Sequence, residues 1–273
     1  MVDRPETERY ELGDLIAILA RLRAPDGCPW DREQSLASLR SYLIEEAHEL
    51  LEAIDRDDAE AHREELGDLL LQIVFQSQIR AEQGRFDMRD VVDGLARKLL
   101  RRHPHVFGQE QADTPAEVVV HWERIKQQEK AGQEPASASA LDSVPRSLPA
   151  LLSAHRLGER AARSGFDWES AHQVLTKVHE ELAELLAELE PEPSARAGEE
   201  LGDLLFALAN LARHLSLCSE DLLRQANRRF RERFAALERL AEERGLQLDQ
   251  ADADALEALW QQAKRSLAGD ESR

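Results

Sequence analysis

The chain has 273 residues, of which 54 are acidic and 35 basic, so its formal net charge at pH 7 is −19. This charge disfavours a broad nucleic-acid interface, because proteins that bind the phosphate backbone usually present a basic face. Aromatic residues make up only 5% of the sequence, whereas Leu, Ala, Glu and Arg are abundant. Such a composition favours an all-α fold and leaves few residues suited to sheets.

Targeting signals and disulfides are not expected either. No apolar run approaches the roughly 18 residues of a membrane span, and the charged start lacks the apolar stretch of a secretory signal. Cys28 and Cys218 are far apart and belong to no C-x-x-C or zinc-type cluster. We therefore expect a cytoplasmic protein without a disulfide framework, and without a nucleic-acid or membrane partner.

The first predicted elements with a clear pattern are two amphipathic helices, joined by a turn near residues 55–58. Apolar residues recur at helical spacing along both. They are Leu43, Ala47, Leu50, Leu51 and Ile54 in the first helix, and Leu66, Leu69, Leu70, Ile73 and Val74 in the second. The pattern predicts a helical hairpin whose apolar stripes need partner helices.

Residues 131–142 are small, polar and proline-containing, and they lack helical periodicity, so they are predicted to form a linker. The sequence after this linker repeats the sequence before it. The stretch Glu-Glu-Leu-Gly-Asp-Leu-Leu occurs at 64–70 and again at 199–205. We therefore predict two copies of one domain, at 8–130 and 143–266.

The second copy repeats the helical hairpin, with a break at the prolines of Glu190-Pro-Glu-Pro-Ser194. Its apolar stripes are Leu182, Leu185, Leu186 and Leu189, then Leu201, Leu204, Leu205 and Leu208. The copies also differ, because His103-Pro-His-Val-Phe-Gly108 has no counterpart in the second. They are therefore not expected to be equivalent in function.

Acidic residues follow a two-motif pattern in each copy. Glu46 and Glu49 share one face of a helix, as do Glu65 and Asp68, and an antiparallel hairpin can bring the two pairs together. Acids are about one residue in five here, so a single acidic pair at spacing three is expected by chance and is typical of a solvated helix face. The whole pattern, however, recurs with identical spacing.

Converging carboxylates repel one another unless a cation compensates them, and all-oxygen ligands select Mg²⁺, with Mn²⁺ as a second candidate. Gly67 and Gly202 lie between the acids of the second motif in each copy. Glycine lowers helix propensity, so close approach of a ligand or a helix is one reason for its presence. The sequence therefore predicts an acidic metal site.

These motifs resemble those of the MazG-type nucleoside triphosphate pyrophosphohydrolases in their two-domain bacterial form, and the resemblance covers both halves of the chain. The residues that carry it are Glu180-Glu-Leu-Ala-Glu184, Glu200-Leu-Gly-Asp203, Gly27-Cys-Pro-Trp-Asp31, Arg102-His-Pro-His-Val-Phe-Gly108, Pro145-Arg-Ser-Leu-Pro149 and Gly165-Phe-Asp-Trp168. The resemblance implies an all-α, four-helix-type domain that dimerises and binds Mg²⁺. It also implies hydrolysis of a nucleoside triphosphate to the monophosphate and pyrophosphate, which clears canonical or damaged nucleotides.

The expected metal ligands are the four acids of each copy. They are Glu181, Glu184, Glu200 and Asp203, with counterparts Glu46, Glu49, Glu65 and Asp68. Glu180 or Glu45 is a candidate to orient the attacking water, although the sequence does not separate base from ligand. Such hydrolysis needs charge neutralisation and an in-line water, both of which carboxylate-bound metal can supply.

Cations are expected around the triphosphate. Lys177 and Arg196 each lie one helical turn before an acid of the second copy and share its face. The resemblance implies that Arg229 and Arg233 contact the phosphates, and the first copy offers Lys98 and Arg102. Any single one of these can equally be an ordinary surface cation. Trp260 is a candidate to stack on the base, with a core or dimer contact as the alternative.

Other functions have weaker support in the sequence. Glu45-x-x-His48 matches part of a di-iron motif, but Ala183 replaces the histidine in the second copy, which argues against it. The sequence has neither a P-loop nor a dinucleotide fingerprint, so phosphate binding must be led by metal. A helical regulatory module that binds nucleotide without catalysis is the alternative hypothesis. Base and sugar preference cannot be inferred from the spacing.

Overall fold

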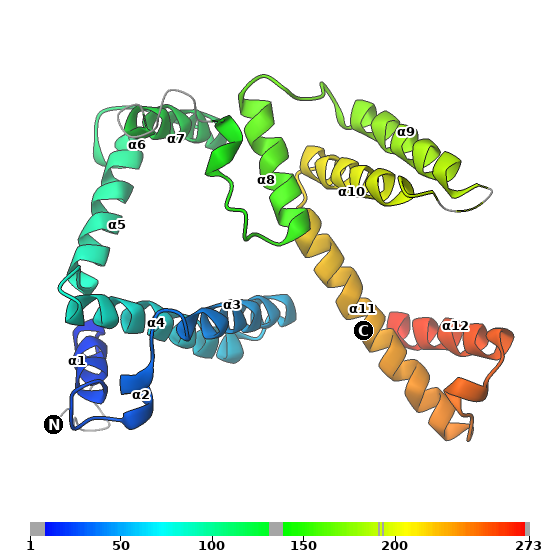
Figure 1. Ribbon diagram of the computed structural model, residues 1–273, viewed down its shortest axis with the longest axis horizontal. Coiled ribbons are helices and arrows are strands. Elements are labelled where there is room, and N and C mark those ends of the chain that lie inside the picture. Colours follow the sequence, from blue (N-terminus) through cyan, green and yellow to red (C-terminus); the bar gives the residue numbers. More distant parts are fainter. Residues whose placement is uncertain (1–8, 131–138, 191, 193, 271–273) are drawn as a thin grey trace. The chain divides into compact units, whose positions relative to one another are not determined.

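A computed structural model describes residues 9–130, 139–190, 192 and 194–270 (Figure 1). Every regular element in these ranges is a helix, which confirms the all-α prediction. The chain divides into two compact units, residues 1–134 and 135–273. Within the described part of the chain, no helix combines the length and apolar character needed to cross a membrane.

The first unit contains an acidic hairpin built from two of its helices. Its elements are α1 (Leu12–Leu22), α2 (Pro29–Glu33), α3 (Leu39–Arg56), α4 (Ala59–Glu82), α5 (Met88–Arg102), α6 (Pro104–Phe107) and α7 (Pro115–Lys130). Helices α3 and α4 lie side by side (Figure 1). Asp57 adopts a left-handed backbone with φ of 53°, and the side chain of Asp58 accepts hydrogen bonds from the amides of Glu60 and Ala61. These features end α3 and cap α4, so the predicted turn is confirmed.

The core of the first unit lies at the α5 end of this hairpin. The buried residues that form it are Leu19, Leu39, Val74, Phe75, Ile79 and Met88. Towards the turn, the predicted apolar stripe stays uncovered, because Ile54, Leu66 and Ile73 are exposed. The stripe was predicted to need partner helices. Within the described residues of this unit, other helices cover only the end of the stripe that lies far from the turn.

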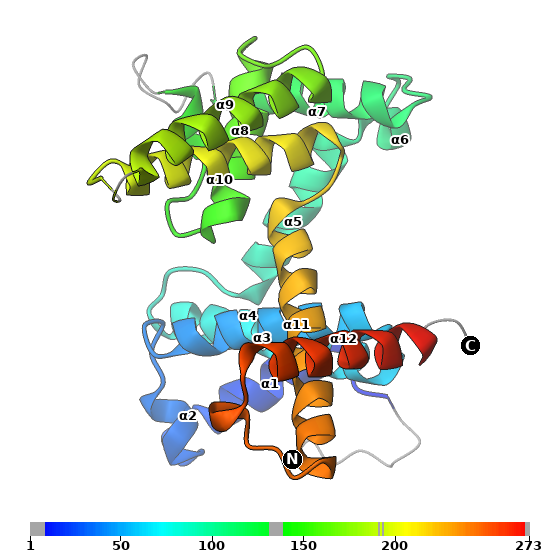
Figure 2. The ribbon, with the colours of Figure 1, turned by 90° about the vertical axis from the view of Figure 1, so that its right-hand side faces the viewer.

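The second unit contains a second acidic hairpin and a second pair of packed helices. Its elements are η1 (Ala140–Ser143), α8 (Ala150–Arg163), α9 (Ala171–Leu189), α10 (Ala197–His214), α11 (Ser219–Glu243), η2 (Leu248–Gln250) and α12 (Ala253–Asp270). Helices α9 and α10 form the hairpin, and α12 packs against α11 (Figures 1 and 2). The core between α11 and α12 centres on Leu237 and Leu259.

The last residues of the predicted linker at 131–142 contain local structure. Residues 131–138 lie outside the described part of the chain. Ala140–Ser143, however, forms a 3₁₀ turn, and the hydroxyl of Ser139 accepts a hydrogen bond from the amide of Leu141 to cap it. A serine followed three residues later by Asp142 forms a capping box, a local signal that the search for helical periodicity missed.

An ion-pair network joins the loop before α9 to the end of α10. The two terminal nitrogens of the Arg213 guanidinium donate to Asp167, Nη1 at 3.0 Å and Nη2 at 2.5 Å, and Nε2 of His214 lies 3.0 Å from the same carboxylate. The Arg213 hydrogen bond is the main cause that lowers the pKa of Asp167 to about 2. Asp167 therefore holds the 165–168 loop as a carboxylate.

Asp167→Asn is expected to lower the free energy of unfolding by about 1–3 kcal/mol at pH 7. Because the folded-state pKa is depressed, the stabilisation is fully present above the unfolded pKa of about 4 and is lost as the pH falls towards 2. Urea unfolding of both proteins between pH 7 and pH 2.5 tests this. The exposed pair Arg21–Asp26 supplies a control, since Asp26→Asn should leave the midpoint unchanged. A difference between wild type and Asp167→Asn that does not shrink in acid would contradict the assignment.

Gly158 of α8 is the point where α8 lies against α10. A Cβ at this position would lie 2.2 Å from Oδ1 of Asn210, which is fully buried and held by hydrogen bonds to Phe206 and Arg213. Gly158→Ala should therefore lower the free energy of unfolding by about 1–3 kcal/mol. Gly198→Ala, on α10 with no atom within 4 Å of its Cβ, should not lower it. Equal thermal midpoints for the two variants would show that this helix contact is not tight.

Candidate active site

The acidic hairpin of the second unit gathers three carboxylates. Glu181 and Glu184 lie on α9 and Glu200 on α10, and one oxygen of each lies within 4.8 Å of the others. Glu181 and Glu200 are each only 6% exposed, whereas Glu184 is open to solvent. Residues three apart on α9 share a face, and the α9–α10 hairpin turns this face towards Glu200.

The first unit repeats this arrangement with Glu46, Glu49 and Glu65, again with oxygens within 4.8 Å. The fourth predicted acid of each copy, Asp68 or Asp203, lies one turn further along its helix and outside the group of three. The structure therefore brings together three of the four predicted ligands in each copy.

Cations distinguish the two acidic clusters. Nζ of Lys177 lies 2.8 Å from Glu180 and 2.7 Å from Glu181, and these contacts raise the pKa of the lysine. Arg196 donates to Glu200 at 2.9 Å. The buried acids of the second cluster are thus partly neutralised by basic side chains one turn away, as the spacing predicted.

Within the described ranges, the first cluster has no such compensation from the preceding helical turns, because Tyr42 and Ala61 stand at the positions of Lys177 and Arg196. Burial raises the pKa of Glu46, and the neighbouring carboxylates, Asp68 first among them, raise it further. The pKa of Glu65 is raised in the same way, by burial and then by Glu49. Glu45, the candidate to orient water here, is exposed beside the cluster.

The basic residues predicted further along each copy differ in whether an acidic side chain pairs with them. Arg229 and Arg233 lie on α11, and neither forms an ion pair with any residue in the described ranges. Lys98 is exposed on α5. Arg102, at the end of α5, instead donates to Glu129 of α7 at 2.6 Å.

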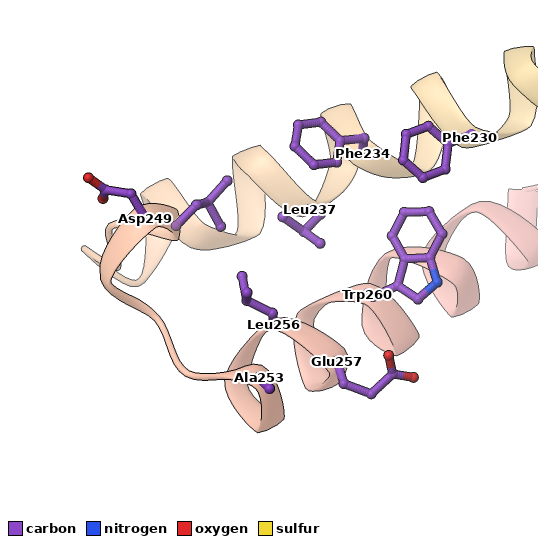
Figure 3. A pocket seen from close by; sticks show the side chains of 9 residues that line it. Phe230, Phe234, Leu237, Asp249, Ala253, Leu256, Glu257 and Trp260 are labelled. Carbon is purple, nitrogen blue, oxygen red and sulfur yellow. The ribbon is translucent and has the colours of Figure 1, made fainter. Parts of the chain in front are cut away.

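Helices α11 and α12 form an apolar pocket (Figure 3). Phe230 stacks with Phe234 at a centroid distance of 6.1 Å, and Trp260 of α12 lies 5.4 Å from Phe230. Trp260 both lines the pocket and packs against the core of Leu237 and Leu259. Sequence reasoning missed the two phenylalanines. A signal was present, because Arg229 and Arg233 lie four residues apart and each is followed directly by a phenylalanine.

The glycines between the acids have no close neighbour. A Cβ added at Gly67 or Gly202 would meet no atom within 4 Å of those described. Neither glycine is therefore required by packing within the described chain. The predicted reason for these glycines, close approach of a ligand or a helix, would therefore involve a bound ligand or a helix of a partner.

Residues 34–107 match the family model of the MazG nucleotide pyrophosphohydrolase domain. The chain is 46% identical over 258 residues to a nucleoside triphosphate pyrophosphohydrolase of Escherichia coli (strain K12), covering 93% of this chain and 97% of that protein. It is 44% identical to nucleoside triphosphate pyrophosphohydrolase/pyrophosphatase MazG of Thermotoga maritima, covering 95% of this chain and 96% of that one. The Mycolicibacterium smegmatis nucleoside triphosphate pyrophosphohydrolase is 39% identical over 65% of this chain and 54% of its own length. With its acidic hairpins and this near-full-length similarity, the chain belongs to the MazG family of nucleotide pyrophosphohydrolases.

Proposed function

We propose that this chain hydrolyses nucleoside triphosphates to the monophosphate and diphosphate, with the acidic hairpin of the second copy as its main active site. The observation that carries the proposal is the convergence of Glu181, Glu184 and Glu200 beside Lys177 and Arg196. The relatives from Escherichia coli and Thermotoga maritima, which are similar along nearly the whole chain, bear the name of the same reaction.

The donor set fits a hard divalent cation. Three carboxylates within 4.8 Å, two of them buried, are a costly arrangement without a positive charge, and oxygen ligands favour Mg²⁺ or Mn²⁺. Glu181, Glu184 and Glu200 would hold the ion, with Asp203 as a fourth ligand one turn away. When bound, the ion would neutralise phosphate charge and favour attack by water.

The chain's own cations would complete the site. Lys177 and Arg196 neutralise carboxylates in the ligand-free protein, and we propose that they contact phosphate oxygens once metal neutralises those acids. Arg229 and Arg233, which have no acidic partner among the described residues, would bind the remaining phosphate charge. Glu180, released from Lys177, would orient the water and accept its proton.

The aromatic pocket of α11 and α12 would hold the nucleobase. Every base has a π-face, so the ring of Trp260 gives affinity without demanding one base. Phe230 and Phe234 lie next in sequence to Arg229 and Arg233, which places base and phosphate contacts on one helix. We therefore propose a nucleotide-binding α11–α12 pair.

We further propose that the domains are the predicted copies at 8–130 and 143–266, joined by 131–142, and that the protein acts in the cytoplasm. The first copy would be structural or weakly active, because Tyr42 and Ala61 supply no charge beside its acids. The alternative is a helical regulatory or nucleotide-binding module in which one or both copies have lost catalysis, and the missing charge at Tyr42 and Ala61 favours this role for the first copy.

The reaction is tested by ³¹P NMR of the products from each nucleoside triphosphate with Mg²⁺. We expect nucleoside monophosphate and pyrophosphate in equal amounts, with no nucleoside diphosphate and no orthophosphate. Release of orthophosphate would place the cleaved bond elsewhere, and no product at micromolar protein with any triphosphate would overturn the proposal.

A homodimer is expected in solution, because the α9–α10 hairpin carries an uncovered apolar face. The exposed residues of this face are Leu175, Leu182, Leu186, Leu189, Leu201, Leu205, Phe206 and Leu208. Light scattering should give twice the 30.9 kDa chain mass. Leu186→Glu should shift the mass towards the monomer, whereas a wild-type protein of monomer mass at working concentrations would contradict this prediction.

A further inference from the structure

The basic end of α5 in the first unit is already occupied by a carboxylate of the same unit. Nε of Arg101 donates to one oxygen of Glu129 at 2.6 Å, and Arg102 donates to the other oxygen at 2.6 Å. The Glu129 side chain is 23% exposed, so it lies largely inside this contact. Hydrogen bonds from Arg102 and Arg101 lower the pKa of Glu129 to about 2, so it is charged at any working pH.

The pocket beside this contact repeats the pattern. Arg101, Arg124, Glu110 and Glu129 line it together with Pro104 and Ile125. Arg124 pairs with Glu110 at 2.5 Å. Each arginine of the pocket wall thus faces a carboxylate from its own unit, and the pocket presents no unpaired positive charge among its lining residues.

The second copy differs at the matching position. Glu129 lies seven residues after Trp122, and the residue seven after Trp260 is Leu267. Leu267 packs against the apolar core of α11 and α12, where it offers no charge. Arg233, the counterpart of Arg102, accordingly forms no ion pair among the residues described, whereas Arg102 does.

We propose that Glu129 is a resident anion that occupies the phosphate-binding position of the first copy and closes that copy to triphosphates. The inference rests on the proposed function, because it takes Arg102 as the counterpart of a phosphate-binding arginine. The inference also explains a difference that the acidic clusters do not explain, namely that Arg102 is paired with a carboxylate and Arg233 is not.

An intramolecular carboxylate is a strong competitor. A tethered group acts at an effective concentration in the millimolar range or above, provided its geometry matches. Glu129 matches both arginines at once, with short charge-assisted hydrogen bonds on each oxygen. A free triphosphate at cellular concentration must displace these bonds before it can bind.

The test counts binding sites for inorganic tripolyphosphate, supplied as its Mg²⁺ complex, on the full chain by isothermal titration. We expect one site per chain in wild type and two in Glu129→Gln, with the second lost again in Glu129→Gln/Arg101→Gln. Asp93→Asn is the matched control, because it frees Arg97 of the same helix but creates no converging pair. A thermal melt verifies folding. If Glu129→Gln does not fold, Glu129→Leu replaces it, because leucine stands at the matching position of the second copy.

A folded Glu129→Gln or Glu129→Leu protein with no added site would overturn the inference and make Glu129 a structural tie. Two sites in wild type would overturn it as well. A site gained by the variant while wild type has none would support the inference, and would count against the phosphate contacts proposed for the second copy. The two proposals therefore fail separately.

Discussion

Glu200→Gln is expected to reduce triphosphate hydrolysis by several orders of magnitude in a Glu65→Gln background that silences the first copy. The change keeps the size and hydrogen-bonding shape of the side chain but removes one of the negative charges that would hold Mg²⁺. Glu200 is buried, and among the described residues its carboxylate has only Arg196 as a basic partner. The loss should therefore arise from metal binding, and added Mg²⁺ should recover part of the rate.

Glu199→Gln supplies the matched control, because Glu199 precedes Glu200 on α10 but points to solvent. It should retain the rate of the background protein, and both variants should melt within a few degrees of it. Pyrophosphate release against Mg²⁺ concentration provides the measurement. Turnover of Glu200→Gln at the background rate, with a normal melt, would remove Glu200 from the site.

Glu181→Gln and Glu46→Gln, made singly in otherwise wild-type protein, are expected to have very unequal effects. Glu181→Gln should remove most of the turnover, whereas Glu46→Gln should leave most of it. The two residues hold the same place in their clusters. The second cluster has Lys177 and Arg196 beside it and the first has neither, so only the second offers enough positive charge for a triphosphate with about four negative charges.

The steady-state rate of each variant at saturating Mg²⁺ tests this asymmetry. Lys177→Gln should move the second copy towards the behaviour of the first, mainly through a higher KM. Equal losses in Glu46→Gln and Glu181→Gln would show that the copies share the turnover, and would remove the charge argument.

The hairpins were predictable because they depend on local signals. The apolar periodicity of Leu43 to Val74, the turn at Asp57 and the repeated acidic motif are all short-range features, and the structure contains the helices and the turn they predict. The convergence of the three acids followed from two helix faces and one antiparallel turn. Lys177 and Arg196 were found by the same rule, because a contact at spacing four depends only on the helix.

Contacts between distant segments were not predictable in this way. Glu129 meets Arg101 and Arg102 across 27 or more residues, and no motif marks it. The pairing of Asp167 with Arg213 is equally long-range. The exposure of Leu66 and Leu186 in the apolar stripes was not predictable either, because periodicity shows which face is apolar but not what covers it.

The most direct measurement of the central claim is the number of Mn²⁺ ions bound per chain, by electron paramagnetic resonance, in the presence of a triphosphate analogue with a methylene bridge between its α and β phosphorus atoms. In the Glu65→Gln background, we expect Mn²⁺ to bind to the chain, to be lost when Glu181 and Glu200 are both changed to Gln, and to be kept in Glu199→Gln. Mn²⁺ binding that survives the loss of both Glu181 and Glu200 would contradict the account, because the ion would then be held elsewhere.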